Sequence, residues 1–408
     1  MKFSHTATTL GFWRRLVKQA VRRQPTPFYL FSVEPLRAAL RELETVQNGV
    51  KIPVRHWLSF KTQPLKPLVR WWCRQGGSVE VVSEFEYRAA LAEGFAPERI
   101  LLNGPAKHTW LPREAVAGLN VHFDSLTEAR ALAPLARKLH WRAGVRIHTR
   151  EEHDPENPGL PTQFGMTAEE VLPAIDFLRR ARVRTESVHF HLRTNVASPA
   201  IYERALLDVA AICARAGFAP RYVDCGGGFP PPHVLSPDGR RYDAQFRLAA
   251  LAQVYRRALA AFPSARELWL ENGRFLSARS GVLVLQVREV KERPGLRQLI
   301  CDAGRTTQAL ISNWEAHELL CLPARRGRRQ LTAVCGPTCM AFDQLARRPL
   351  PAGIRAGDHL VWLDAGAYHI PWETRFSHGW AAALWHEGGR LTLARPAETF
   401  AQWWGQWA

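Results

Sequence analysis

Residues 222–230, Tyr-Val-Asp-Cys-Gly-Gly-Gly-Phe-Pro, place three consecutive glycines directly after a short apolar run that is typical of a buried strand. Because glycine has no Cβ atom, the three residues can adopt positive φ angles and turn their backbone N–H groups toward one point. Such a cradle can bind an anion, for example a phosphate group. A tight turn without a ligand would use the same residues, so the rest of the chain must decide between the two interpretations.

Around this stretch, short apolar runs alternate with longer runs of helical periodicity. Eight strands are predicted, at residues 54–60, 78–82, 100–104, 118–123, 143–147, 183–192, 222–225 and 267–270. Strict alternation of strands and helices favours a closed (β/α)8 barrel of the TIM type over an open sheet. In such a barrel, catalytic side chains lie at the carboxyl ends of the strands.

Beyond residue 280 the alternation is replaced by short β runs, which indicate a second, mostly β domain. We expect an α/β protein in which residues 33–280 form the barrel and residues 281–408 form the C-terminal β domain. Residues 1–32 contain a basic helical segment and a short strand at residues 28–31. We expect this N-terminal segment to contribute to the β domain.

The composition argues against a membrane protein and against a metal site. Hydrophobic residues make up 46% of the chain, but no run reaches the roughly 18 uncharged apolar residues of a membrane span. The start of the chain lacks the hydrophobic stretch of a signal peptide, so we expect a cytoplasmic protein with no membrane partner. The seven cysteines include no Cys-x-x-Cys pair, so we predict neither a metal site nor a disulfide framework.

Lysine and arginine outnumber aspartate and glutamate by 55 to 37, which gives a net charge of +18. The excess is spread along the chain, and its one dense run, at residues 325–329, is predicted to be a solvated loop. No nucleic-acid-binding module is recognisable, so we predict no nucleic-acid partner. An acidic protein, or a substrate carried on one, would suit this charge as well.

Several residues lie near the ends of predicted strands or shortly after them and would converge on one mouth of the barrel. They are Lys61, His189, His191, Glu271, Gly273 and Arg274. Desolvation at the end of an apolar strand lowers the pKa of a lysine, which suits Schiff-base formation. A lysine, a phosphate cradle, a carboxylate and a flat histidine are together what pyridoxal phosphate (PLP) requires. Taken singly, each has a simpler explanation, as a surface lysine, a core histidine or an exposed turn.

Six further motifs extend this pattern along nearly the whole chain. They are 26–29 (Thr-Pro-Phe-Tyr), 97–100 (Pro-Glu-Arg-Ile), 103–107 (Asn-Gly-Pro-Ala-Lys), 335–339 (Cys-Gly-Pro-Thr-Cys), 357–359 (Gly-Asp-His) and 364–368 (Asp-Ala-Gly-Ala-Tyr). With these motifs the chain resembles the PLP-dependent decarboxylases of the alanine-racemase-like fold (fold type III), the family of diaminopimelate and ornithine decarboxylases. The resemblance implies a PLP-dependent amino acid decarboxylase, a lyase of amino acid metabolism, whose barrel binds the cofactor.

The resemblance also implies roles for individual residues. Lys61 would form the Schiff base with PLP, and His191 would stack on the pyridine ring. Glu271 would keep the ring nitrogen protonated, which makes the ring an electron sink. Cys339 would enter the site from a partner subunit and help to reprotonate the product, which implies a homodimer with shared active sites. The residues expected to hold the phosphate are Thr194, Gly226, Gly227, Gly228, Gly273, Arg274 and Tyr368.

The chain departs from the family pattern at four positions. Met340 stands where relatives that read a distal ammonium group have an acidic residue, and a thioether cannot pair with an ammonium. Arg193 replaces a glycine and could bind an anionic group of the substrate; Glu80 and Asn272 are milder changes. We predict that Arg193, Met340 and Asp343 bind the substrate. This substrate is then not a simple diamino acid but one with a neutral or anionic distal end, such as a carrier-tethered amino acid or a precursor in specialised biosynthesis.

Two other functions remain compatible with the sequence. A racemase or epimerase of the same fold uses the same electron sink, although alanine racemases generally pair the ring nitrogen with arginine, so Glu271 favours a decarboxylase. A non-catalytic, decarboxylase-like regulator that binds a partner protein is favoured by Met340 and Arg193. The presence of Lys61, Glu271 and Cys339 argues against that regulator.

Overall fold

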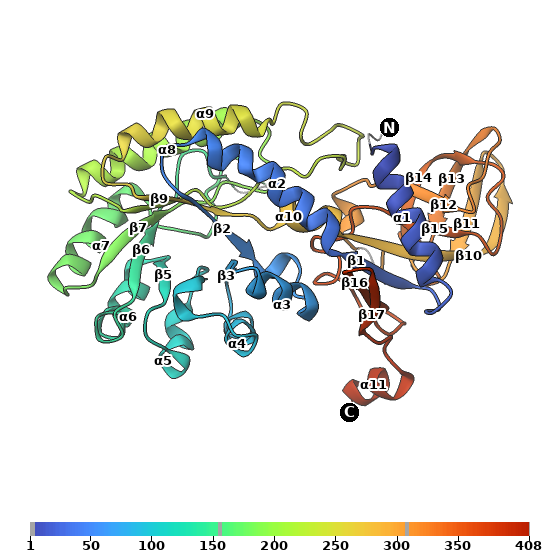
Figure 1. Cartoon of the computed structure of the whole chain (residues 1–408), viewed down its shortest axis with the longest axis horizontal. Coiled ribbons are helices and arrows are strands. Elements are labelled where there is room, and N and C mark those ends of the chain that lie inside the picture. Colours follow the sequence, from blue (N-terminus) through green and yellow to red (C-terminus); the bar gives the residue numbers. More distant parts are fainter. Residues whose placement is uncertain (1–4, 154–156, 307–309, 408) are drawn as a thin grey trace.

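The computed structural model describes residues 5–153, 157–306 and 310–407. Its larger part is a closed barrel of eight parallel strands, β2 to β9, which confirms the predicted (β/α)8 fold. The strands are β2 (Val54–Ser59), β3 (Ser78–Val81), β4 (Ile100–Leu102), β5 (Asn120–Phe123), β6 (Arg142–Arg146), β7 (Thr185–His189), β8 (Tyr222–Asp224) and β9 (Glu267–Glu271). Figure 1 shows the barrel on the left and a second, β-rich part on the right.

Helices surround the barrel strands, and polar side chains explain where several helices begin. The helices are α2 (Val33–Gly49), α3 (Lys66–Arg74), α4 (Glu84–Ala92), α5 (Leu111–Glu114), α6 (Leu126–Lys138), α7 (Ala168–Arg180), α8 (Pro199–Arg215), α9 (Leu248–Ala258) and α10 (Arg274–Ser277). Helix α7 begins with a capping box in which the side chains of Thr167 and Glu170 satisfy exposed backbone N–H groups. Among the described residues, no helix has the length and apolar character needed to cross a membrane.

The second part is a nine-stranded sheet in the order β14-β13-β11-β10-β1-β16-β17, with β15 and β12 branching from β10. Its strands are β1 (Phe28–Ser32), β10 (Gly281–Arg293), β11 (Leu296–Cys301), β12 (Leu319–Leu322), β13 (Arg329–Cys335), β14 (Gln344–Pro351), β15 (His359–Trp362), β16 (Ala382–Glu387) and β17 (Arg390–Arg395). Strand β1 lies inside this sheet, antiparallel to β10 and parallel to β16. The beginning of the chain is therefore built into the sheet formed by its end.

Helix α1 (Ala7–Ala20) covers one face of this sheet, and alternation along β1 explains why. Phe28 and Leu30 point toward α1, where they pack with Trp13 and Val17. The intervening side chains belong to the main core that is shared with the barrel. Because successive side chains of a strand point to opposite faces, β1 joins the two cores. A short helix, α11 (Phe400–Trp404), projects from the end of the sheet (Figure 1).

Candidate active site

The barrel brings the predicted lysine, histidine and glutamate together at the carboxyl ends of its strands. Lys61 lies in a single 3-10 turn (Phe60–Thr62) directly after β2, and Glu271 is the last residue of β9. His191 follows β7, and its Nδ1 atom lies 3.9 Å from Oε2 of Glu271. These residues therefore form one site, as expected for the mouth of a barrel.

Lys61 is paired with a carboxylate from the neighbouring strand. Its Nζ atom lies 2.7 Å from Oε2 of Glu80, a buried residue of β3. Burial by itself would lower the pKa of Lys61, but the charges of Glu80, Tyr368 and Glu271 and the hydrogen bond with Glu80 together raise it. The prediction of a lowered lysine pKa is therefore wrong for this state, because it ignored the carboxylate beside the strand end.

Glu271 is a buried carboxylate among other carboxylates. It accepts a hydrogen bond from Nδ2 of Asn103, and Nε2 of His189 lies 3.3 Å from its Oε1 atom. Burial, followed by the charges of Asp224 and Glu80, raises the pKa of Glu271 well above its usual value. A protonated ring nitrogen at this place would supply the missing positive charge, so the donor set of the site fits PLP.

Both histidines of the His-Phe-His motif are neutral. Burial, followed by the charges of Arg146 and Lys61, lowers the pKa of His191 to about 3. Its Nδ1 atom accepts a hydrogen bond of 3.2 Å from the backbone N–H of Gly227. His189 lies deeper in the barrel and stacks on His122, with ring centroids 4.9 Å apart. An uncharged, half-buried His191 ring suits stacking on a flat cofactor.

The glycine run is packed too tightly for side chains. A Cβ atom on Gly227 would lie 2.3 Å from the carbonyl oxygen of Glu271, and one on Gly228 would lie 2.3 Å from that of Arg193. Gly226 has a φ of +62° and donates its N–H to Oδ1 of Asp224 at 2.9 Å. The N–H groups of Gly226 and Gly227 thus bond within the site itself, and phosphate binding by the glycines stays a prediction.

Arg274, at the start of α10, contacts two other residues that are expected to hold the phosphate, Thr194 and Tyr368. Its Nε atom donates to Oγ1 of Thr194 at 3.0 Å, and its guanidinium lies 4.5 Å from the ring centroid of Tyr368. It also forms an ion pair with buried Glu315. Although burial opposes it, the Arg274 charge, with help from a hydrogen bond from His317, lowers the pKa of Glu315 to about 2. Sequence reasoning missed Glu315, which carries no local signal.

The predicted substrate-binding residues lie on two separate segments. Arg193 is exposed at the barrel mouth, whereas Cys339 and Met340 lie between β13 and β14 in the β domain, with Cys339 exposed. Asp343 in the same segment is buried and accepts hydrogen bonds from the Thr306 N–H (3.0 Å) and the Thr338 hydroxyl (2.6 Å). Its carboxylate therefore bonds within its own loop and to Thr306. The substrate-binding roles of Arg193, Met340 and Asp343, and the role of Cys339 in reprotonating the product, stay predictions.

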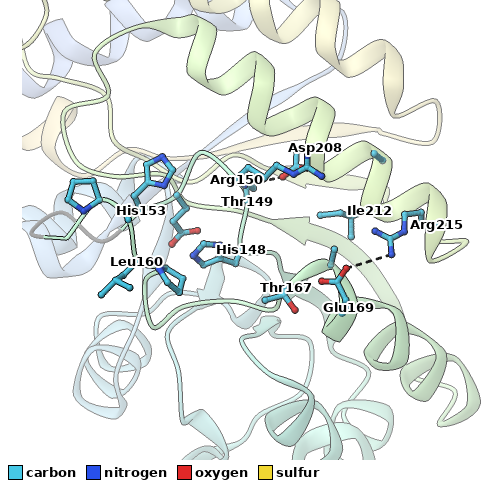
Figure 2. Close-up of a pocket in the computed structure, with 16 residues that line it drawn as sticks. His148, Thr149, Arg150, His153, Leu160, Thr167, Glu169, Asp208, Ile212 and Arg215 are labelled. Atoms are coloured by element: carbon cyan, nitrogen blue, oxygen red, sulfur yellow. Dashed lines mark hydrogen bonds and ion pairs between the residues drawn. The ribbon is translucent and has the colours of Figure 1, made fainter.

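A cavity of about 580 Å³ lies between the segment after β6 and helix α8 (Figure 2). The residues labelled there include His148, Arg150 and Asp208, and the described residues that line it include none of the predicted site residues. Arg146, at the end of β6, acts through its charge on His191 and Glu271 in the site. It bonds to Glu152 at 3.1 Å and stacks 4.6 Å above the ring of Phe164, so it fastens the segment after β6 to the barrel.

Comparison with known proteins identifies the family. A sequence model of the "Pyridoxal-dependent decarboxylase, pyridoxal binding domain" matches residues 37–278. The diaminopimelate decarboxylase of Actinosynnema pretiosum subsp. auranticum is 30% identical over 351 residues, which cover 82% of this chain and 76% of that protein. The L-glutamyl-[BtrI acyl-carrier protein] decarboxylase of Niallia circulans is 27% identical over 371 residues, covering 86% and 85%.

The fold is shared with solved structures. The crystal structure of diaminopimelate decarboxylase from Helicobacter pylori with L-lysine superposes with a TM-score of 0.81 at 22% identity, covering 96% of this chain and 98% of that one. With its barrel, its mostly β second part and the match over residues 37–278, the chain belongs to the PLP-dependent decarboxylases of fold type III. It is a carboxy-lyase with PLP as its cofactor, and this membership favours decarboxylation over the racemase and regulator alternatives.

Proposed function

We propose that the enzyme decarboxylates an α-amino acid through a Schiff base between PLP and Lys61, and that this substrate lacks a free distal ammonium group. The position of Lys61 supports the first part, because Lys61 follows β2 directly and interacts electrostatically with Glu271 and His191. Bound PLP supplies an electron sink for the carbanion that loss of CO₂ creates.

Side chains of the protein would orient the cofactor, bind its phosphate and transfer protons. Glu271 would hold a proton on the ring nitrogen, and neutral His191 would cover one face of the ring. Glu80 bonds to the Lys61 ammonium at 2.7 Å, so it is placed to take the proton that Lys61 must lose before it can act as a nucleophile. Arg274, Thr194 and Tyr368 would hold the phosphate by charge and hydrogen bonds.

The substrate proposal rests chiefly on Met340. This residue follows Cys339, in the segment expected to reach the site of a partner subunit, and it offers no charge to a distal ammonium. The Niallia circulans relative, whose name specifies a glutamyl group on an acyl-carrier protein, is an example of a family member whose substrate has no distal ammonium. The net charge of +18 would also suit an acidic carrier.

The test is CO₂ release from matched substrates by the PLP-loaded enzyme. We expect release from a glutamyl group attached to a carrier protein to exceed release from diaminopimelate, lysine and ornithine by at least tenfold. Lys61→Ala, the control, should release none. If diaminopimelate or another diamino acid is the best substrate, the substrate proposal is wrong; if Lys61→Ala retains activity, the Schiff-base assignment is wrong.

A further inference from the structure

A continuous hydrogen-bonded chain of buried side chains runs beneath the mouth of the barrel. It connects Ser187 (β7), His122 (β5), Asn103 (after β4) and the two carboxylates of Glu80 and Glu271. All five side chains are at most 5% exposed. None of Ser187, His122 and Asn103 was predicted to belong to the site.

The two carboxylates determine which atoms donate and which accept along this series of hydrogen bonds. Nδ2 of Asn103 lies within hydrogen-bond distance of Oε1 of Glu271 and 3.5 Å from Oε1 of Glu80. Carboxylate oxygens accept hydrogen bonds, so the amide must turn its NH₂ group toward them and its Oδ1 atom away. The NH₂ group of Asn103 thus donates hydrogen bonds to both carboxylates.

His122 holds this orientation of the amide. Its Nδ1 atom lies 2.9 Å from Oδ1 of Asn103, and its Nε2 atom lies 3.0 Å from Oγ of Ser187. Burial, followed by the charges of Lys107 and Arg146, lowers the pKa of His122 to about 3, so the ring carries one proton. Since Oδ1 of Asn103 can only accept, that proton must sit on Nδ1, and Ser187 must donate to Nε2.

We propose that Asn103 is a positioning residue that couples the carboxylate facing the ring nitrogen (Glu271) to the carboxylate paired with Lys61 (Glu80), and that His122 and Ser187 hold it in place. The inference rests on the proposed attachment of PLP to Lys61. Without an N–H donor between them, the two buried carboxylates would repel each other and lose part of their stabilisation as anions. Glu271 would then be a stronger base, so the proton between it and the ring nitrogen would lie closer to Glu271 and would be lost only at a higher pH.

The test replaces Asn103 by leucine and follows the bound cofactor rather than turnover. In the PLP-loaded protein, Asn103→Leu should raise the dissociation constant for PLP by tenfold or more, because hydrogen bonds to charged groups are lost. It should also move the pH midpoint of the visible absorption change of bound PLP upward by about one unit. His122→Phe, which keeps the stack on His189 but loses the bond to Asn103, should cause a smaller shift in the same direction.

Asn120→Leu is the matched control. Asn120 is another buried barrel asparagine whose Nδ2 atom makes two 3.0 Å bonds, but to the backbone oxygens of Glu98 and Ile100. An unchanged midpoint in Asn103→Leu, or an equal shift in Asn120→Leu, would overturn the inference. If Asn103→Leu does not fold, the His122→Phe variant provides the test. A pH midpoint in His122→Phe equal to that of the wild type would then overturn the inference. Failure of the Lys61 assignment is distinguishable, because the visible band would then persist in Lys61→Ala.

Discussion

At the scale of single residues, the carboxylates at the mouth of the barrel are buried close together, and a neighbouring cation would stabilise their ionised forms. Burial raises the pKa of Asp224 to about 7, and burial and neighbouring carboxylates raise that of Glu271. The two residues end adjacent strands. The close approach of these carboxylates lowers the stability of the PLP-free protein. A protonated ring nitrogen of bound PLP would offset this loss.

Glu271→Ala should therefore separate activity from stability. We expect the decarboxylation rate to fall by about 10²–10³, because a preorganised charge opposite the ring nitrogen is lost. The melting temperature of the PLP-free protein should stay the same or rise, since a buried, crowded carboxylate is removed. Steady-state kinetics and thermal unfolding measure the two effects.

Glu267→Ala is the control for that variant. Glu267 begins the same strand and pairs with Arg55 at 3.1 Å, away from the mouth. Its removal should leave the rate unchanged. A rate loss as large as that of Glu271→Ala would mean that strand β9, and not the carboxylate at its end, controls the activity.

At the scale of elements, the turn that carries Lys61 is packed against the start of α10. A Cβ atom on Gly273 would lie 2.3 Å from Cγ2 of Thr62, the residue after Lys61. Gly273→Ala should push this turn outward, lower stability by about 1–3 kcal/mol and weaken PLP binding. Urea unfolding and PLP titration measure both effects.

Gly405→Ala provides the comparison for this packing argument. Gly405 has open space around its Cβ position and no positive φ, so the substitution should leave both quantities unchanged. Wild-type PLP binding in Gly273→Ala would show that the contact between α10 and the lysine turn does not position Lys61.

Another element-scale feature is the attachment of α1 through His5. Its Nδ1 lies 2.7 Å from Oε2 of Glu318 and its Nε2 lies 2.8 Å from Oδ2 of Asp364. Burial opposes protonation, but these two carboxylates raise the pKa of His5 to about 9. Protonated His5 therefore links the segment before α1 to the residues that flank the paired strands β12 and β15 of the β domain.

The pH dependence of stability follows from this shift. Because the folded pKa of about 9 exceeds the usual value of about 6.5, His5 contributes fully below about pH 6.5 and its contribution is lost as the pH rises to about 9. His5→Gln should be less stable than the wild type by up to about 3 kcal/mol near pH 6 and equally stable near pH 10. Unfolding by urea at both pH values measures this, and a pH-independent difference would contradict it.

At the scale of the whole molecule, we expect each active site to combine Lys61 of one subunit with Cys339 of another. Mixing Lys61→Ala with Cys339→Ala, each inactive or nearly so alone, should then restore about a quarter of the wild-type activity, because half of the dimers are mixed and each has one intact site. Activity that stays at the level of the separate variants after subunit exchange would place both residues in the same subunit's site. Size-exclusion chromatography of the wild type reports whether a dimer forms.

Much of the architecture was predictable from local patterns. Alternating strand and helix signals predicted the barrel, and the residues after the strands, among them Lys61, His191 and Glu271, were recognised from their positions alone. These signals are local because strand and helix periodicity is a property of neighbouring residues. Together with the glycine run these residues already indicated PLP, and the family motifs then added the decarboxylase family and the role of each residue.

The charge states and the hydrogen-bonded chain depend on contacts between strands, and no sequence pattern predicted them. Lys61, after β2, bonds to Glu80 on the adjacent strand β3. Asn103 bonds to Glu271, which lies 168 residues further along the chain. Closure of the barrel creates these contacts and removes the side chains from water at the same time. Burial and neighbouring charge together set each pKa, so only the folded barrel decides which groups in the site carry protons.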